Sequence, residues 1–374
     1  MNGRPGAYVH VPFCAHRCAY CSFVALEGRE GEKDFFDGVE REIRARAREV
    51  AGRLDTVYFG GGTPSYVPLE RLSRLLLTLE EVFGLSSGVE ITVEGNPDDL
   101  STERLCELRD IGVNRLSVGV QSLVDAELVP LERRHDATSA RCAVSEAVRI
   151  FGNVSADLMI GIPGQTRETL QGSVDGLLGA GIAHLSVYLL EIEKAPKLVK
   201  LRAGRPDLFA DDEEMADRWE GVDRSAAAAG LPRYEISNWA RPGSESRHNL
   251  KYWEHEPVLG FGVAAHSFDG RTRRANTGSM TEYLRRVADG KSAFVSNEEG
   301  TEDFLRRESV MLGLRLAAGV PADSFEETQR LLPAESRARL EDAFAAGLLE
   351  PAGGRVRLTQ RGVLLSNEVF SLFV

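Results

Sequence analysis

Short apolar segments of strand character alternate with amphipathic helical segments through the first half of the chain, and this alternation is the feature that most constrains the fold. The expected strands cover residues 7–11, 56–59, 90–94, 115–120, 154–160 and 184–190. The expected helices cover residues 33–50, 69–82, 101–110, a segment from about 137, and 168–180. Such alternation predicts an α/β fold with parallel strands and outer helices. Six units are too few for a closed eight-stranded barrel, so we expect a partial (β/α)6 barrel, open on one side.

The alternation ends near residue 190, and the rest of the chain has a different pattern. We expect three parts: a barrel at residues 1–230, a loop-rich connecting region at 231–297 and a C-terminal helical module at 298–374. In the last part, helical patterns at 305–316 and 334–346 precede a predicted hairpin around Gly353 and Gly354. Helices followed by such a hairpin predict a winged-helix-like fold.

Residues that are unusual in a core follow the expected strands. They are the cysteines near residue 14, the glycines at 60–62, Glu94, Gln121 and the turn after Asp157. In parallel α/β folds, the carboxyl ends of the strands form the ligand site. We therefore expect one functional site at this end of the barrel.

Composition excludes several classes of protein. The 374-residue chain has a net charge of −12, which argues against a surface built for nucleic acid. It has no apolar run as long as a membrane span and no signal-peptide pattern before the first strand, so we expect a cytoplasmic protein. The five cysteines are an odd number, which does not suit a secreted disulfide framework. Two of them, Cys106 and Cys142, lie in helical patterns and are expected to be small buried thiols.

The other three cysteines, Cys14, Cys18 and Cys21, fall within eight residues after the first expected strand. Thiolates are soft ligands that suit zinc or iron–sulfur clusters. Zinc sites usually take four ligands in paired short spacings, and no fourth Cys or His follows at such a distance. His16 lies inside the loop, where it is too cramped to complete a tetrahedron easily. We therefore expect an iron–sulfur cluster with one iron open to a ligand, with zinc or free thiols as the alternative.

A second motif, Gly-Gly-Gly-Thr-Pro at residues 60–64, ends the second expected strand. Glycines let the backbone approach a ligand closely and adopt positive φ. The run is not a phosphate-binding loop, because no Lys follows at the required spacing. Alone it would indicate only a turn. Beside three thiolates, its exposed carbonyls can accept hydrogen bonds from the amino group of a bound methionine.

Together these motifs resemble those of the radical S-adenosylmethionine (SAM) superfamily, and within it the HemN and HemW group. The matching stretches, in family order, are 8–14, the Cys-x3-Cys-x2-Cys triad, 60–64, 94–97, 119–121 and 157–166. Residues 308–320 are also similar to the C-terminal domain of the group. The resemblance implies a radical-SAM partial barrel with a [4Fe–4S] cluster on the three cysteines and SAM on its open iron.

The resemblance also assigns roles to residues at the strand ends. Tyr8 would lie beside SAM. The methionine end of SAM would be held by the backbone of Gly60, Gly61, Gly62 and Thr63. Its other polar groups would be contacted by Glu94, Gln121, Arg133 and Asp157. Arg suits carboxylates, and Asp or Glu suits ribose hydroxyls. Arg134 is the alternative to Arg133, because the register could shift by one residue.

Phe23 distinguishes two families within the group. Oxygen-independent coproporphyrinogen III oxidases carry a fourth cysteine two residues after the third, and here that position is Phe23. The Cys-x-Phe ending and the short segment before Tyr8 resemble the HemW heme chaperones instead. This resemblance implies a chaperone that binds heme or a porphyrin and delivers heme to an acceptor protein. The alternatives are a coproporphyrinogen oxidase and a related radical SAM enzyme of methyl transfer or cyclopropanation.

Residues 248–253 read His-Asn-Leu-Lys-Tyr-Trp and resemble the HemW motif His-Asn-x-x-Tyr-Trp. Imidazole is a common axial ligand of heme iron, and aromatic rings can stack on the macrocycle. We expect His248 to contact heme; the alternative is a structural histidine that caps a turn. His266 is a weaker candidate. The C-terminal module is expected to be a lid or docking surface, because the acidic balance argues against DNA binding.

Overall fold

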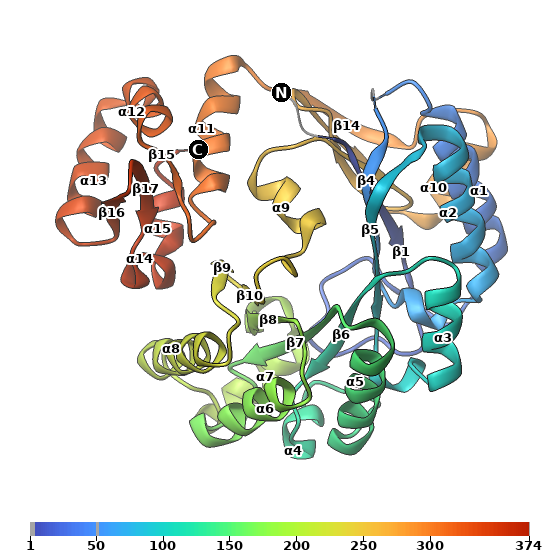
Figure 1. The fold of residues 1–374 in the computed structure, drawn as a ribbon, viewed down its shortest axis with the longest axis horizontal. Helices are drawn as coiled ribbons and strands as arrows, with labels where there is room; N and C mark the ends of the chain where they lie inside the picture. The colour runs from blue at the N-terminus through green and yellow to red at the C-terminus, as the bar shows by residue number, and fades with distance from the viewer. Residues whose placement is uncertain (1–3, 50–51, 374) are drawn as a thin grey trace.

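The computed structural model describes residues 4–49 and 52–373. Its centre is a sheet whose six parallel strands alternate with helices along the chain (Figure 1). These strands are β1 (Gly6–Val11), β4 (Leu54–Gly61), β5 (Leu85–Gly95), β6 (Arg115–Gln121), β7 (Val154–Ile160) and β8 (His184–Leu189). Each pairs in parallel with the next. The predicted α/β partial barrel is therefore confirmed, and all six carboxyl ends lie at the same end of it.

Helices follow the strands along the chain, as the alternation predicted. They are α1 (Glu32–Ala45), α2 (Leu69–Phe83), α3 (Thr102–Asp110), α4 (Asp125–Leu128), α5 (Ala137–Phe151) and α6 (Arg167–Gly179). The hydroxyl of Ser101 caps α3, where it accepts a hydrogen bond from the N–H of Arg104 at 3.2 Å. Helix α1 stops at Ala45, before its predicted end at Val50, a residue outside the described part of the chain.

Residues 231–297, which we expected to be rich in loops, mainly lengthen the sheet. They form β9 (Arg233–Glu235), β10 (Asn238–Ala240), β11 (Val258–Phe261), β12 (His266–Phe268), β13 (Thr272–Asn276) and β14 (Phe294–Glu299), with helices α9 (Arg247–Trp253) and α10 (Met280–Ala288). The complete order is β14-β13-β12-β11-β1-β4-β5-β6-β7-β8-β10-β9. These strands, of three to six residues, were not predicted from the sequence. They are held by pairing, β11 with β1 and β10 with β8.

The C-terminal module has the predicted winged-helix-like fold. It consists of α11 (Glu302–Gly313), β15 (Val320–Pro321), α12 (Ala322–Leu331), α13 (Ala334–Ala345), β16 (Leu349–Ala352), β17 (Arg355–Leu358), α14 (Gln360–Leu364) and α15 (Ser366–Phe370). Gly353 and Gly354, both at positive φ, form the tight turn between β16 and β17. The sequence did not predict α12, because its buried face contains only Phe325 and Thr328.

The module packs against the barrel through α11 and the segment that follows it. The N–H of Ala317 donates to the carbonyl of Tyr234 on β9 at 2.9 Å. On α11, Glu308 accepts hydrogen bonds from His255 at 2.9 Å and from Arg273 on β13 at 3.1 Å. Figure 1 shows α9 between the sheet and the module, and α9 contacts both β4 and α11.

No helix within the described residues is long and apolar enough to cross a membrane.

Candidate functional site

The cysteine loop leaves the carboxyl end of β1 and folds back beside it. Cys14 lies in the short strand β2 (Phe13–Cys14), which pairs in parallel with β3 (Leu26–Glu27). Cys18 and Cys21 lie between these strands and are partly exposed. His10 on β1 fixes the loop, because its Nε2 is hydrogen-bonded to the carbonyl of Val24 at 2.8 Å. The three thiols thus lie at the strand end where a site was predicted.

All three thiols are free and lie in one loop, so they can act as metal ligands. A zinc ion needs its ligands around one point, whereas a [4Fe–4S] cluster carries each thiolate on a different iron. Burial raises the pKa of Cys14 to about 11, although Thr63 donates a hydrogen bond to its sulfur at 3.4 Å. The positive charge of bound iron would favour the thiolate.

The glycines at the end of β4 occupy places where a side chain would not fit. A Cβ on Gly60 would lie 3.0 Å from the carboxyl group of Glu94. On Gly61, which has φ +109°, it would lie 2.5 Å from the ring of His10. On Gly62 it would lie 2.8 Å from the backbone that leads into the cysteine loop. The three glycines therefore allow the end of β4 to pack closely between the cluster loop and Glu94, where no side chain would fit.

Glu94, at the end of β5, faces this backbone. Its Oε1 accepts a hydrogen bond from the hydroxyl of Tyr58 at 2.8 Å, and its Oε2 accepts one from the N–H of Gly61 at 3.0 Å. Burial raises the pKa of Glu94 to about 7, and the charge of Asp157 adds to the effect. A buried carboxylate beside exposed backbone suits a cationic or hydroxyl-bearing ligand.

Arg133 reaches the site from the loop after α4. Its Nη1 lies 3.4 Å from the sulfur of Cys18, and its Nη2 donates to Oδ1 of Asn96 at 2.6 Å and to the carbonyl of Gly119 at 2.5 Å. Its Nε is buried and has no hydrogen-bond partner among the described residues. That unused donor fits a ligand with a carboxylate. Arg134 does not share this position, and its side chain is 51% exposed.

Gln121 and Asp157 lie at the neighbouring strand ends. Gln121 has φ +67°, a left-handed conformation that is uncommon for residues other than glycine, and it interrupts the pairing of β6 with β7. A Cβ on Gly119 would lie 3.0 Å from its Nε2, so the Gln121 side chain lies over the end of β6. Asp157 accepts a hydrogen bond from the hydroxyl of Ser117 at 3.1 Å, and burial raises the pKa of Asp157.

His248 lies inside the barrel, among aromatic side chains. Its side chain is 1% exposed, its Nδ1 is hydrogen-bonded to the hydroxyl of Thr56 at 2.9 Å, and its Nε2 to the hydroxyl of Tyr252 at 3.2 Å. The ring centres of Tyr58 and Tyr8 lie 5.1 Å and 6.3 Å from it. Burial lowers the pKa of His248 to about 3, so the imidazole is neutral. Because both nitrogens have partners, Nε2 can bind iron only if Tyr252 moves away.

Sequence reasoning missed three residues that hold the site together, which are His10, Tyr58 and Asn96. His10 on β1 and Tyr58 on β4 each lie between core residues of their strand. That pattern by itself also fits ordinary core packing. Asn96 was quoted only as part of the motif at 94–97, yet its Nδ2 donates to the hydroxyl of Thr63 at 3.0 Å. It therefore links the glycine loop to Arg133.

The expectation that Cys106 and Cys142 are buried thiols was wrong. Cys106 is partly exposed, and Cys142 is exposed. The buried face of α5 passes through Ala140, Ala143 and Ala147, so the side chain at position 142 points outward.

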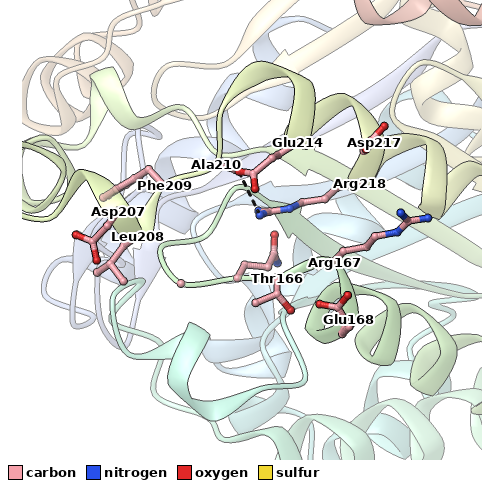
Figure 2. Close-up of a pocket in the computed structure, with 12 residues that line it drawn as sticks. Thr166, Arg167, Glu168, Asp207, Leu208, Phe209, Ala210, Glu214, Asp217 and Arg218 are labelled. Carbon is pink, nitrogen blue, oxygen red and sulfur yellow. Dashed lines mark ion pairs between the residues drawn. The ribbon is translucent and has the colours of Figure 1, made fainter.

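A cavity of about 550 Å³ lies outside this constellation, between the start of α6 and the start of α8 (Asp212–Ala228) (Figure 2). None of the predicted site residues lines it. Figure 2 shows the Arg218 side chain ending beside Glu214, whose carboxylate lies 3.9 Å from its guanidinium. Acidic and basic side chains both line this cavity, among them Glu168, Asp217 and Arg167. It is therefore a polar surface cleft.

Comparison with known proteins identifies the family. A model of the Radical SAM superfamily matches residues 8–176, and a model of the HemN C-terminal domain matches residues 301–365. The chain is 38% identical to the heme chaperone HemW of Bacillus subtilis, over 98% of each chain. The chain belongs to the HemW family. Its likeness to the HemW of Escherichia coli is 30% identity, over 98% of this chain and 97% of that one.

The HemW-family chain also resembles a solved structure, that of the coproporphyrinogen III oxidase HemN from Escherichia coli. The TM-score is 0.85, and the match covers 99% of this chain and 90% of HemN at 24% identity. This likeness shows a common fold. Radical SAM membership supports the expected [4Fe–4S] cluster and SAM, and the thiols, glycine backbone and Arg133 fit both groups. Which residues bind the cluster and which bind SAM stays a prediction.

Proposed function

We propose that the protein is a heme chaperone that binds heme on a radical-SAM scaffold and delivers it to an acceptor protein. The observation that carries this proposal is Phe23, in a chain of the HemW family. It stands where the resembled oxidases have a fourth cysteine, and its side chain is 62% exposed at the cysteine loop. The fold alone does not separate the two functions, because HemN shares it.

In this proposal, Cys14, Cys18 and Cys21 hold the cluster, and the residues at the strand ends hold SAM. When bound, the cluster supplies an electron with which SAM can be cleaved. Arg133 and the glycine backbone orient the methionine end of SAM. Glu94 and Asp157 are placed to form hydrogen bonds with its other polar groups, although burial raises the pKa of both and favours their protonated forms while the site holds no cation. The protein thereby positions the cofactor and limits its contact with water.

Heme is proposed to enter from the side of α9, where the family motif lies. Tyr252 is 38% exposed, whereas His248 directly beneath it is enclosed. Displacement of the Tyr252 hydroxyl would free Nε2 of His248 for the iron. A cytoplasmic location stays a prediction of the sequence, and the sequence does not identify the acceptor protein.

Anaerobic titration of the purified, cluster-reconstituted protein with heme tests the function. We expect a stoichiometric shift in the visible absorbance of heme, and His248→Ala should alter the spectrum and weaken binding. Absence of heme binding by the wild-type protein would overturn the proposed chaperone function. In a parallel assay with coproporphyrinogen III, appearance of protoporphyrinogen IX would assign the oxidase function instead. Methylated or cyclopropanated product from an added acceptor would assign the third function.

A further inference from the structure

Arg315, which follows α11 in the C-terminal module, has a guanidinium group that is largely buried and donates no hydrogen bond to any described residue. Its side chain is 26% exposed, and its Nε is inaccessible and without a partner. The carboxylate of Glu235 lies 3.8 Å from its Nη2, beyond hydrogen-bond distance. Buried cations normally have hydrogen-bonded partners, whereas Arg315 has only this ion pair with Glu235, whose Oε2 is also buried without a hydrogen bond among the described residues.

Aromatic rings hold the guanidinium in place. It lies over the ring of Trp253 at 4.1 Å, and the ring of Phe370 is 5.9 Å away. Burial lowers the pKa of Arg315, and Glu235 opposes that effect. The Nε1–H of Trp253 is also buried without a partner among the described residues. Stacking therefore fixes the plane of the guanidinium, and its Nη groups, which donate no hydrogen bond to a described residue, can bind a carboxylate.

The surroundings of Arg315 connect it to the barrel interior. Tyr188, at the end of β8, is 43% exposed, and β8 pairs with β10, which pairs with β9, the strand that carries Glu235. Tyr252 is 38% exposed, and its ring centre lies 6.4 Å from that of Trp253. The arginine thus stands at an edge of the barrel where aromatic rings are open to solvent, and flat apolar ligands stack on such rings.

We propose that Arg315 binds a propionate of heme, and that the exposed rings of Tyr188 and Tyr252 border the macrocycle. The inference rests on the proposed function. Heme carries two carboxylates on one edge of a flat apolar ring, which matches one unused guanidinium beside exposed aromatic side chains. The C-terminal module, which we expected to be a lid or docking surface, then contributes directly to the heme site.

The test compares two ligands and three proteins. The ligands are heme and the dimethyl ester of the same iron porphyrin, which lacks the carboxylates, both in the same detergent. The proteins are the wild type, Arg315→Gln and Arg306→Gln, an exposed arginine on α11 that pairs with Glu302. We expect Arg315→Gln to weaken heme binding by roughly tenfold to a hundredfold and to leave binding of the ester unchanged. Arg306→Gln should bind both ligands as the wild type does.

Each other outcome has a definite meaning. Equal affinity of the wild type and Arg315→Gln for heme overturns the inference and leaves the chaperone function intact. An equal loss for heme and ester also overturns it, because the arginine would then act only through packing. Failure of the wild type to bind either ligand overturns the proposed function as well. If Arg315→Gln does not fold, Arg315→Lys keeps the charge without the two-pronged contact, and it should lose part of the preference for heme over the ester.

Discussion

Nη1 of Arg133 lies 3.4 Å from the sulfur of Cys18, while Nη2 of the same side chain donates to Oδ1 of Asn96 and to the carbonyl of Gly119. One guanidinium group therefore connects the cysteine loop to the ends of β5 and β6. Its Nε is buried and has no partner among the described residues, so the guanidinium keeps an unused donor beside the cysteine loop.

Arg133→Lys should weaken SAM binding while the cluster still assembles. Lysine keeps the charge but loses the planar group that contacts three elements at once. We expect a loss of roughly tenfold to a hundredfold in SAM affinity by anaerobic equilibrium dialysis. Arg134→Lys, at an exposed position, is the matched control and should bind SAM normally. Unchanged SAM affinity in Arg133→Lys would remove this residue from the site.

Glu94→Gln should make the cofactor-free protein more stable at alkaline pH. The pKa of Glu94 in the folded state is raised to about 7 by burial, above its ordinary value of 4.5. The folded state therefore binds the proton more tightly, and stability falls as pH rises through that window. At about pH 8 the variant should gain about 1–2 kcal/mol in urea unfolding, and the gain should vanish near pH 4.

The control for this prediction is Glu80→Gln, which changes an exposed glutamate on α2. It should show no such pH dependence. Glu94→Gln should also bind SAM less tightly, because an amide attracts the cationic part of the cofactor less than a carboxylate does. A stability gain that is the same at both pH values would contradict the raised pKa.

Each of the variants Cys14→Ala, Cys18→Ala and Cys21→Ala should lack the iron–sulfur absorbance after anaerobic reconstitution. Each of the three thiolates is expected to hold one iron of the cluster, so the loss of any one leaves a second iron without its protein ligand. Cys106→Ala and Cys142→Ala serve as controls and should keep full iron and sulfide content, because both side chains lie on outer helices. Retention of the cluster in any of the first three variants would show that its assigned ligand is wrong.

Tyr252→Phe should increase heme affinity if His248 is the iron ligand. The Tyr252 hydroxyl occupies Nε2 of His248 at 3.2 Å, and phenylalanine keeps the ring while it removes that competitor. The net value of one such hydrogen bond corresponds to roughly a two- to tenfold gain. The measurement is heme titration followed by visible absorbance. The same affinity in Tyr252→Phe and in the wild type would indicate that His248 is structural and that iron binds elsewhere.

That the candidate site residues lie at one end of the barrel could be predicted because parallel strands end together. Once the six strands were recognised, Cys14, Glu94 and Asp157 had to approach one another, whatever the details of packing. The choice between Arg133 and Arg134 needed the structure, because neighbouring residues in a loop differ in direction but not in sequence signal. The side chain of Arg133 turns inward to the sulfur of Cys18.

The features that sequence could not supply depend on contacts between distant segments. The burial of His248 follows from the packing of α9 against β4 inside the open barrel, and no local pattern shows that depth. The strands β9 to β14 exist because neighbouring strands supply their hydrogen bonds. Arg315 gave no signal at all, because an isolated arginine between Leu314 and Leu316 is typical of a solvated helix end.

Strands β13 and β9 lie near opposite ends of the long sheet, and the C-terminal module contacts both of them. Glu308 binds Arg273 on β13, and Leu316 forms a bridge with Glu235 on β9. The module therefore links the two ends of the sheet, and these ends cannot move apart unless one of the two contacts breaks. We expect the rate of heme uptake to depend on the strength of these contacts. Glu308→Gln should therefore load heme faster in stopped-flow mixing, while its final affinity changes little.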